Sequence, residues 1–122
     1  MKVLVVDDSS TMRRIIGNAL KSFMPDAEVV EAEDGNDGFE KFEANQDAGL
    51  ILSDWNMPNC DGLEFLKKVV ATGSKVPVIM VTTEAEKSNV VTAIKSGAKN
   101  YVTKPFTPDI LKGKINQTLG IS

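Results

Sequence analysis

Five short apolar runs alternate with helical patterns along this chain, and no other feature restricts the possible folds as strongly. The runs lie at residues 2–6, 28–32, 50–54, 77–81 and 100–103. Each is short and rich in apolar residues, as buried strands are. Strands that are separated by helices pair in parallel through right-handed crossovers. The sequence therefore predicts an α/β fold, a doubly wound five-stranded parallel sheet with helices on both faces.

The segments between the runs have the pattern of amphipathic helices. Residues 12–23 repeat apolar side chains at the three- and four-residue spacing of one helix face. A short helix is predicted to start at residues 34–35, and a third after residue 61. The side chains expected to face the sheet are Met12, Ile15, Ile16, Ala19, Leu20 and Phe23 in the first helix, Phe39 and Phe42 in the second, and Leu63, Leu66, Val69 and Val70 in the third.

Capping residues mark the starts of the last three helices. An N-cap residue accepts a hydrogen bond from the backbone of the first turn, and an acid three residues later completes the motif. A glycine after the last apolar position indicates a helix end. The predicted starts are Asp61 with Glu64, Thr83 with Glu86, and Thr107 with Pro108 and Asp109, and the helix over 83–96 is expected to end by Gly97.

The composition excludes several classes of protein. The 122 residues suit one domain, expected to span 1–122 with no output domain. No stretch approaches the roughly 18 apolar residues of a membrane span, and a net charge of −3 argues against a nucleic-acid partner. The single cysteine excludes an intrachain disulfide and suits a reducing cytosol, so a cytoplasmic location is expected. Without histidine, the chain has no histidine-dependent triad and no phosphohistidine.

Polar residues stand at the carboxyl ends of four runs: Asp7 and Asp8 after the first, Asp54 on the third, Thr82 after the fourth and Lys104 after the fifth. Open α/β sheets bind ligands at this edge. Crowded carboxylates repel one another unless a cation neutralises them, and Mg²⁺ prefers carboxylate oxygens together with phosphate. The pattern therefore predicts a Mg²⁺-dependent phosphoryl-transfer site in which Asp54 attacks phosphorus. Lys104 and the Thr82 hydroxyl would contact the phosphoryl oxygens.

These residues and their neighbours give the chain a resemblance to a known family. The stretch Val5-Val6-Asp7-Asp8 and the segments 54–64 and 101–107 resemble the receiver domains of bacterial two-component response regulators, above all the chemotaxis regulators of the CheY type. The resemblance covers the whole chain. It implies the strand order 2-1-3-4-5 and a signalling switch that catalyses only its own phosphorylation and dephosphorylation, not an enzyme.

The resemblance also implies a role for each residue of the site. Asp54 is then the phosphoacceptor. Mg²⁺ would be bound by Asp8, by Asp54 and by the backbone carbonyl of Asn56, with Asp7 contributing directly or through water. The remaining implied roles are phosphoryl sensing for Thr82 and Lys104, an aromatic switch for Tyr101, and a cis peptide bond between Lys104 and Pro105.

The partners implied by the resemblance are proteins of the chemotaxis system. A histidine kinase such as CheA would supply the phosphoryl group, and the phosphorylated monomer would bind the flagellar switch protein FliM and control the direction of rotation. A phosphatase is a further possible partner, and no nucleic acid or membrane is expected. The surface expected to contact FliM combines Ala85, Val90, Ile94, Ala98, Tyr101 and Lys114.

Some alternatives stay open at the level of sequence. Tyr101 could be strand packing instead of a switch, and Ile94 could belong to the core. A single-domain phosphorelay intermediate, which passes phosphate to a histidine phosphotransfer protein, would carry the same acidic site. A flavodoxin is disfavoured because Asp7 and Asp8 would repel a flavin phosphate. A phosphatase with an aspartate nucleophile would need that nucleophile on the first strand.

Overall fold

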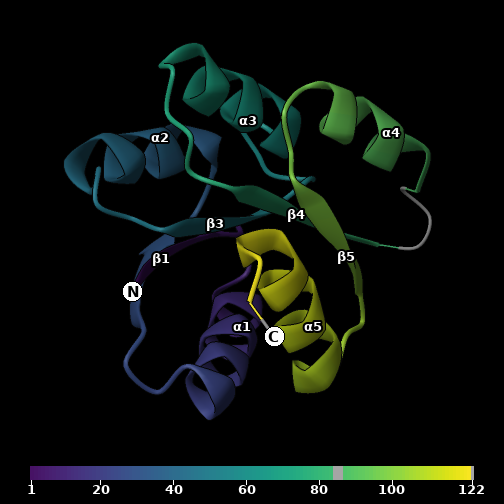
Figure 1. Ribbon diagram of the computed structural model, residues 1–122. Coiled ribbons are helices and arrows are strands. Elements are labelled where there is room, and N and C mark those ends of the chain that lie inside the picture. Colours follow the sequence, from purple (N-terminus) through teal and green to yellow (C-terminus); the bar gives the residue numbers. More distant parts are fainter. Residues whose placement is uncertain (84–86, 122) are drawn as a thin grey trace.

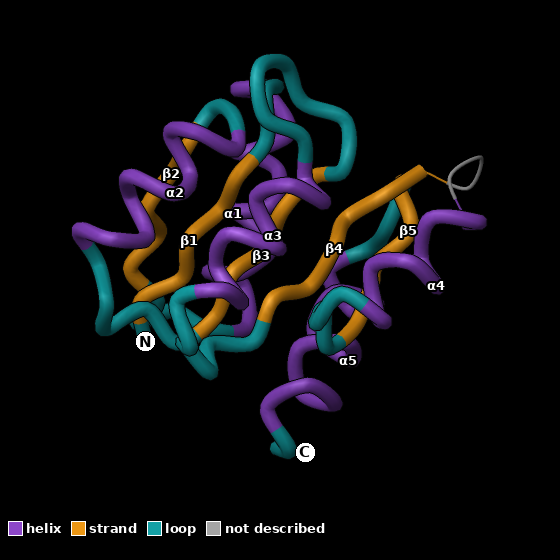
Figure 2. The backbone as a smooth tube through the Cα atoms, turned by 90° about the horizontal axis from the view of Figure 1, so that it is seen from above, coloured by secondary structure: helices purple, strands orange, loops and turns teal. Residues whose placement is uncertain are grey.

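The five apolar runs form the five strands of one parallel sheet. The computed structural model describes residues 1–83 and 87–121. The strands are β1 (Lys2–Val6), β2 (Glu28–Ala32), β3 (Leu50–Asp54), β4 (Val78–Thr83) and β5 (Asn100–Lys104). Figure 2 shows them side by side in the order β2-β1-β3-β4-β5, and every neighbouring pair is parallel. The predicted fold class and strand order are confirmed.

Helices cover both faces of the sheet (Figure 1). They are α1 (Ser10–Phe23), α2 (Gly35–Ala44), α3 (Gly62–Ala71), α4 (Lys87–Lys95) and α5 (Pro108–Leu119). The helices α1 and α5 lie on one face, and α2, α3 and α4 lie on the other. Within the described residues, no helix has the length and apolarity needed to cross a membrane.

Two hydrophobic cores result from the alternation of side chains along the strands. In β1, Val3 and Val5 pack toward α1 and α5, whereas Leu4 and Val6 pack toward α2 and α3. All four are buried. Because consecutive side chains of a strand point to opposite faces, a central parallel strand must be apolar throughout. Full burial of each such side chain stabilises the fold by about 1.5–3 kcal/mol.

Capping side chains fix four helix starts. Ser9, Asp34, Asp61 and Thr107 each accept a hydrogen bond from the backbone N–H three residues later, at 2.8–3.2 Å. A cap of this kind contributes about 1 kcal/mol. The predicted caps at Asp61 and Thr107 are therefore confirmed.

The predicted cap at Thr83 depends on residues 84–86, which lie outside the described part of the chain, so it stays a prediction. Thr83 is the last residue of β4 and pairs with Lys104 of β5, and Lys87 is the first residue of α4 that the structure describes. Pairing with β5 keeps Thr83 extended, so the strand ends at Thr83 and not at Val81, where the sequence pattern predicts its end. The expected capping partner of Thr83, Glu86, lies outside the described residues.

Two side chains expected to face the sheet are exposed instead. Ile15 of α1 is 47% exposed and Val70 of α3 is 44% exposed. In α3, the residues that face the sheet are Gly62, Phe65, Leu66 and Val69, which leaves Val70 on the flank of the helix. Phe65, absent from the predicted set, is fully buried. The sheet meets a narrower stripe of each helix than the sequence pattern indicated.

Candidate functional site

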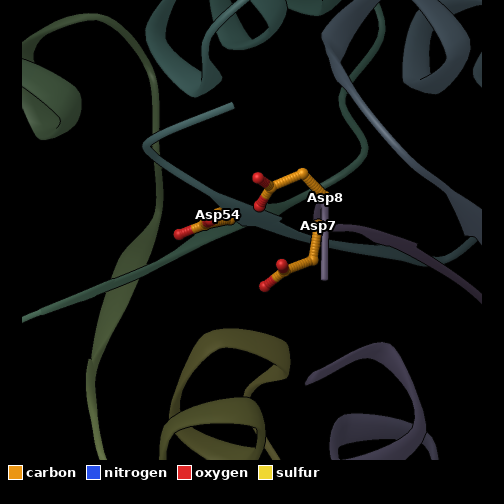
Figure 3. Close-up of side chains that lie close together, drawn as sticks. All are labelled: Asp7, Asp8 and Asp54. Atoms are coloured by element: carbon orange, nitrogen blue, oxygen red, sulfur yellow. The ribbon is translucent and has the colours of Figure 1, made fainter. Parts of the chain in front are cut away.

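Adjacent strands bring the acidic residues together at the carboxyl edge of the sheet. Asp7 and Asp8 follow β1, and Asp54 is the last residue of β3. The two strands are neighbours, and their register pairs Val6 with Ser53, so Asp7 lies beside Asp54. Figure 3 shows the three carboxylates converging from these two strand ends.

The three carboxylates have the geometry of a cation site. Each offers one oxygen, and these oxygens lie within 4.8 Å of one another. Asp7 and Asp54 are buried, whereas Asp8 is exposed. Oxygen donors of this kind suit a hard divalent cation such as Mg²⁺. The residues present therefore fit the predicted ion by the chemistry of their donor set.

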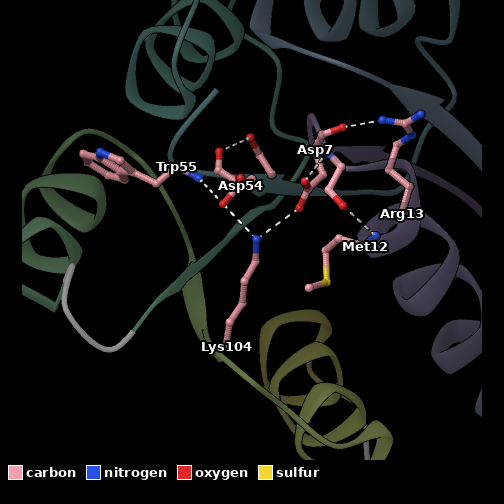
Figure 4. A network of polar contacts seen from close by, with 8 residues as sticks. Asp7, Met12, Arg13, Asp54, Trp55 and Lys104 are labelled. Atoms are coloured by element: carbon pink, nitrogen blue, oxygen red, sulfur yellow. Dashed lines mark hydrogen bonds and ion pairs between the residues drawn. The ribbon is translucent and has the colours of Figure 1, made fainter. Parts of the chain in front are cut away.

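Lys104 reaches the acidic cluster from the end of β5. Its Nζ donates to Asp7 Oδ2 at 3.2 Å and to Asp54 Oδ1 at 3.1 Å (Figure 4). The peptide bond from Lys104 to Pro105 is cis, as the resemblance implies. Asp54 Oδ1 also accepts from the backbone N–H of Trp55 at 2.9 Å. One amine thus bridges carboxylates on two strands.

Burial and charge act together on the ionisation of these groups. Burial raises the pKa of Asp54 above its ordinary value, and the nearby charge of Asp7 raises it further, while Lys104 opposes both effects. Burial lowers the pKa of Lys104, but the attraction of Asp54 and Asp7 outweighs burial, so that this pKa lies above the ordinary value. Lys104 is consequently a cation at neutral pH.

Asp7 and Asp8 differ in how firmly they are held. Four atoms of Asp7 are hydrogen-bonded. In the side chain, Oδ1 accepts from the Ser9 N–H and Oδ2 accepts from the Lys104 amine. In the backbone, the N–H donates to the Ala32 carbonyl and the carbonyl accepts from the Arg13 guanidinium. The Asp8 carboxylate has no hydrogen-bond or ion-pair partner among the residues that the structure describes. Asp8 is therefore the carboxylate most available to a ligand.

Comparison with known proteins gives this constellation a family. The sequence profile described as the response regulator receiver domain matches residues 3–116. The chain belongs to that family. Asp7, Asp8, Asp54 and Lys104 are therefore residues of a receiver domain, in which the acidic cluster is the phosphorylation pocket.

Similar proteins place this receiver domain among chemotaxis regulators. It is 52% identical over 122 residues to the chemotaxis protein CheY1 of Helicobacter pylori, with 98% of both chains covered. It is 51% identical to a CheY homologue of Campylobacter jejuni, covering 98% of this chain and 93% of the relative. The crystal structure of CheY4 from Vibrio cholerae matches with a TM-score of 0.86 at 32% identity, covering 96% and 97% of the two chains. The protein is a CheY-like chemotaxis response regulator, a signalling switch and not a conventional enzyme.

The loop after Asp54 is anchored by contacts that the sequence analysis did not predict. Asn59, with a positive φ of 68°, donates from its side chain to Asp34 Oδ2 at 3.1 Å. The Gly35 N–H donates to the Cys60 carbonyl at 3.0 Å. Cys60 is buried beneath Gly35, and burial raises the pKa of its thiol. These contacts fix the loop that carries Asn56 of the receiver domain. The cap signal at Asp34 was visible in the sequence, but its second partner, Asn59, lies 25 residues away.

The two residues predicted to transmit a signal lie on adjacent strands. Thr82 is buried near the end of β4, and Tyr101 is half-buried on β5. The register pairs Thr82 with Thr103 and Met80 with Tyr101, so Thr82 and Tyr101 face the same side of the sheet. The Lys114 amine of α5 lies 4.4 Å from the centre of the Tyr101 ring. The Tyr101 ring thus packs against the core on the α4 side of the sheet and is contacted by the Lys114 amine of α5.

The structure leaves only some residues of the predicted partner surface accessible. Ile94 is 43% exposed and Val90 is half-buried, so both are accessible on α4. Ala98 is 4% exposed and packs in the same core cluster as Ala93. In the turn after α4, the Ala98 N–H donates to the Ala93 carbonyl at 3.0 Å, which holds Ala98 against this core. Ala98 is therefore not part of the exposed surface. Ala85 lies outside the described residues.

Proposed function

We propose that Asp54 accepts a phosphoryl group from a histidine kinase of the CheA type, and that this phosphorylation controls binding to the flagellar motor switch. The observation that carries the proposal is the position of the Asp54 carboxylate beside Asp7, within 3.1 Å of the Lys104 amine and at the open edge of the sheet. The similarity to chemotaxis protein CheY1 of Helicobacter pylori supports the motor output.

The transfer needs a nucleophile and charge neutralisation. A carboxylate oxygen of Asp54 forms the new bond to phosphorus, and the bond from phosphorus to the imidazole nitrogen of the kinase breaks. That nitrogen leaves as a neutral imidazole after it takes up a proton. The Lys104 ammonium, fixed by two carboxylates, acts as a point charge toward the phosphoryl oxygens. It also favours the ionised, nucleophilic form of Asp54.

The acidic cluster is proposed to hold Mg²⁺ during this reaction. Asp8, Asp54 and the backbone carbonyl of Asn56 would bind the ion, with Asp7 contributing directly or through water. Bound Mg²⁺ would neutralise the carboxylates and shield the incoming phosphoryl oxygens from them. The lack of a partner for the Asp8 carboxylate among the described residues supports this assignment.

Labelling with a small phosphodonor tests the role of Asp54. The protein is incubated with Mg²⁺ and acetyl phosphate, which releases acetate on transfer, and the phosphorylated residue is mapped by mass spectrometry. A single adduct on Asp54 is expected, and Asp54→Ala should lose it. Asp26→Asn, a substitution at an exposed acid remote from the cluster, serves as the control and should be labelled like the parent. An adduct that survives in Asp54→Ala, on an acid other than Asp7 or Asp8, would overturn the assignment.

Thr82 and Tyr101 are proposed to carry the signal away from Asp54. When a phosphoryl group draws the Thr82 hydroxyl toward it, space opens on the face that Tyr101 shares, and the ring can move into that space. Phosphorylation only biases an equilibrium between two states that already exist. Thr82→Ala should therefore accept phosphate at Asp54 but bind the downstream partner more weakly than the phosphorylated parent. Equal binding by the two phosphorylated proteins would refute the coupling.

The proposed partner surface combines Val90, Ile94, Tyr101 and Lys114 on α4, β5 and α5. The strand β5 is the edge of the sheet and lies between these two helices (Figure 1). Apolar side chains next to a lysine suit an amphipathic, acidic helix. The amino-terminal segment of FliM is the proposed occupant.

Peptide titration in two states tests this output. The FliM amino-terminal peptide is titrated into the unmodified and the beryllofluoride-loaded protein. Affinity should rise on loading, and Tyr101→Ala or Lys114→Glu should reduce it, whereas Lys112→Glu, at an exposed α5 position, provides the control. Equal affinity in both states would reject the motor output and favour the phosphorelay intermediate.

A further inference from the structure

Arg13, in the first turn of α1, contacts the backbone of the acidic cluster. Its Nη1 donates to the main-chain carbonyl oxygen of Asp7 at 2.6 Å (Figure 4). Its Nε donates to Glu31 Oε1 of β2 at 2.9 Å. The Arg13 side chain is only 16% exposed. A guanidinium presents its donors in a rigid planar fork, so these two contacts together fix its orientation.

The carbonyl that Arg13 holds belongs to the peptide group that joins Asp7 to Asp8. This group is planar, so its orientation sets ψ of Asp7 and φ of Asp8 together. Those angles determine the direction in which the Asp8 side chain leaves the backbone. The Asp7 side chain has its own partners, Ser9 and Lys104. The Asp8 carboxylate has no partner in the described part of the chain, so the backbone is what fixes the direction of its Cα–Cβ bond.

We propose that Arg13 is a positioning residue for the divalent cation, acting through the Asp7–Asp8 peptide to orient the Asp8 carboxylate before the cation binds. This inference rests on the proposed Mg²⁺ site. Glu31 has a supporting role, because β2 lies on the opposite side of β1 from β3. The ion pair with Glu31 therefore holds the Arg13 charge on the side of β1 away from Asp54.

Whether Mg²⁺ affinity falls or rises when Arg13 is replaced distinguishes a positioning role from a purely electrostatic one. Loss of a positive charge near the cluster should strengthen cation binding if only charge matters. Loss of an orienting contact should weaken it, and substitutions of residues that orient metal ligands typically weaken binding about 10- to 100-fold. Arg14 offers a matched control, since it is the next residue of α1, is exposed, and its side chain makes no hydrogen bond or ion pair among the described residues.

The experiment is a Mg²⁺ titration of the full chain, followed by the fluorescence of its single tryptophan, Trp55, which neighbours Asp54. Arg13→Gln should raise the dissociation constant about tenfold, whereas Arg14→Gln should leave it equal to or lower than that of the parent. Arg13→Lys, which keeps the charge but not the fork, should restore part of the affinity and provides a second variant if Arg13→Gln unfolds. An unchanged or lower dissociation constant in the folded Arg13 variants would overturn the proposal.

A double-mutant cycle tests whether Arg13 acts through Asp8. In an Asp8→Asn background, Arg13→Gln should cause no further loss of Mg²⁺ affinity. A second loss of about tenfold in that background would show an action independent of Asp8 and would overturn the positioning role. A parent protein that binds no Mg²⁺ would instead reject the proposed metal site itself, so the two failures are distinguishable.

Discussion

At the scale of single residues, the charge balance around Asp54 decides the chemistry of the site. Burial and the neighbouring charge of Asp7 favour the protonated form of Asp54, while the Lys104 amine at 3.1 Å favours the ionised form. Only the ionised carboxylate is a nucleophile toward phosphorus. Lys104 thus has two tasks, to keep Asp54 ionised before the reaction and to neutralise charge during it.

Removal of the Lys104 charge should raise the pKa of Asp54 further. In Lys104→Met without metal, the Asp54 carboxyl should titrate at a higher pH than in the parent, because the charge attraction and the hydrogen bond with Lys104, which both lower its pKa, are lost. The carboxyl carbon shift of Asp54 in an NMR titration measures this directly. Lys112→Met, at an exposed position of α5, should leave the titration unchanged. An unchanged pKa in Lys104→Met would contradict the assigned balance of charges.

The raised pKa of Asp54 also predicts how stability depends on pH. The folded state keeps this proton to a higher pH than the unfolded state does, so folding is favoured below the unfolded pKa, and this contribution is lost as pH rises through the folded pKa. The free energy of unfolding of the metal-free protein should contain a component that falls with rising pH just above the ordinary aspartate range. Asp54→Asn should lack that component in denaturation curves compared across pH.

At the scale of elements, the junction between β3 and α3 is the most tightly packed part of the site. A Cβ added at Gly62 would collide with the backbone oxygen of Asp54 and would lie 2.9 Å from the Trp55 Cα. The Gly62 N–H also donates to the Trp55 carbonyl at 2.8 Å. The first residue of α3 thus packs directly against the backbone that carries the phosphoacceptor. Only glycine fits this close approach.

Two glycine substitutions in helices should therefore have opposite effects on stability. Gly62→Ala should lower the free energy of unfolding by about 1–3 kcal/mol, the usual cost of overpacking, and should displace Asp54. In Gly17→Ala of α1, the new Cβ would have no atom within 4 Å. This substitution should raise the free energy of unfolding by about 0.5–1 kcal/mol. Urea denaturation of both variants measures the difference. A stabilised Gly62→Ala protein would contradict the close approach of α3 to the backbone of Asp54 and Trp55.

At the scale of the whole molecule, the acidic cluster couples metal binding to stability. Three carboxylates confined within 4.8 Å repel one another and oppose folding when no cation is bound. Lys104 offsets part of this repulsion by its contacts with Asp7 and Asp54. A cation that binds only the folded state stabilises it in proportion to the logarithm of its concentration.

Thermal unfolding should accordingly respond to Mg²⁺ through Asp8. In the parent, the free energy of unfolding should rise by about 2.7 kcal/mol at a concentration one hundred times the dissociation constant. Asp8→Ala should lose this rise and should be at least as stable as the parent without metal. Glu43→Ala, at an exposed acid of α2, should keep the full response. A Mg²⁺ response that persists in Asp8→Ala would refute the role of Asp8 in metal binding.

The sequence by itself determined the order of the elements and the edge at which the acids meet. Strand runs, the caps at Asp61 and Thr107, and the positions of Asp7, Asp8 and Asp54 could all be predicted, because each depends on local spacing or on the rule that parallel strands end together. The position of Lys104 at a strand end was predicted in the same way, and its two ion pairs with the acids are consistent with it.

Only the tertiary structure decided which side of each element meets a neighbour. Val70 is exposed because only a narrow stripe of α3 faces the sheet, and periodicity alone leaves that stripe too wide. Ala98 is buried because the turn after α4 folds it against the core. The extension of β4 to Thr83 depends on pairing with β5. The contact of Arg13 with the Asp7 carbonyl and the placement of Lys114 over Tyr101 join separate elements. Such contacts depend on how the folded layers pack, which spacing along the chain does not encode.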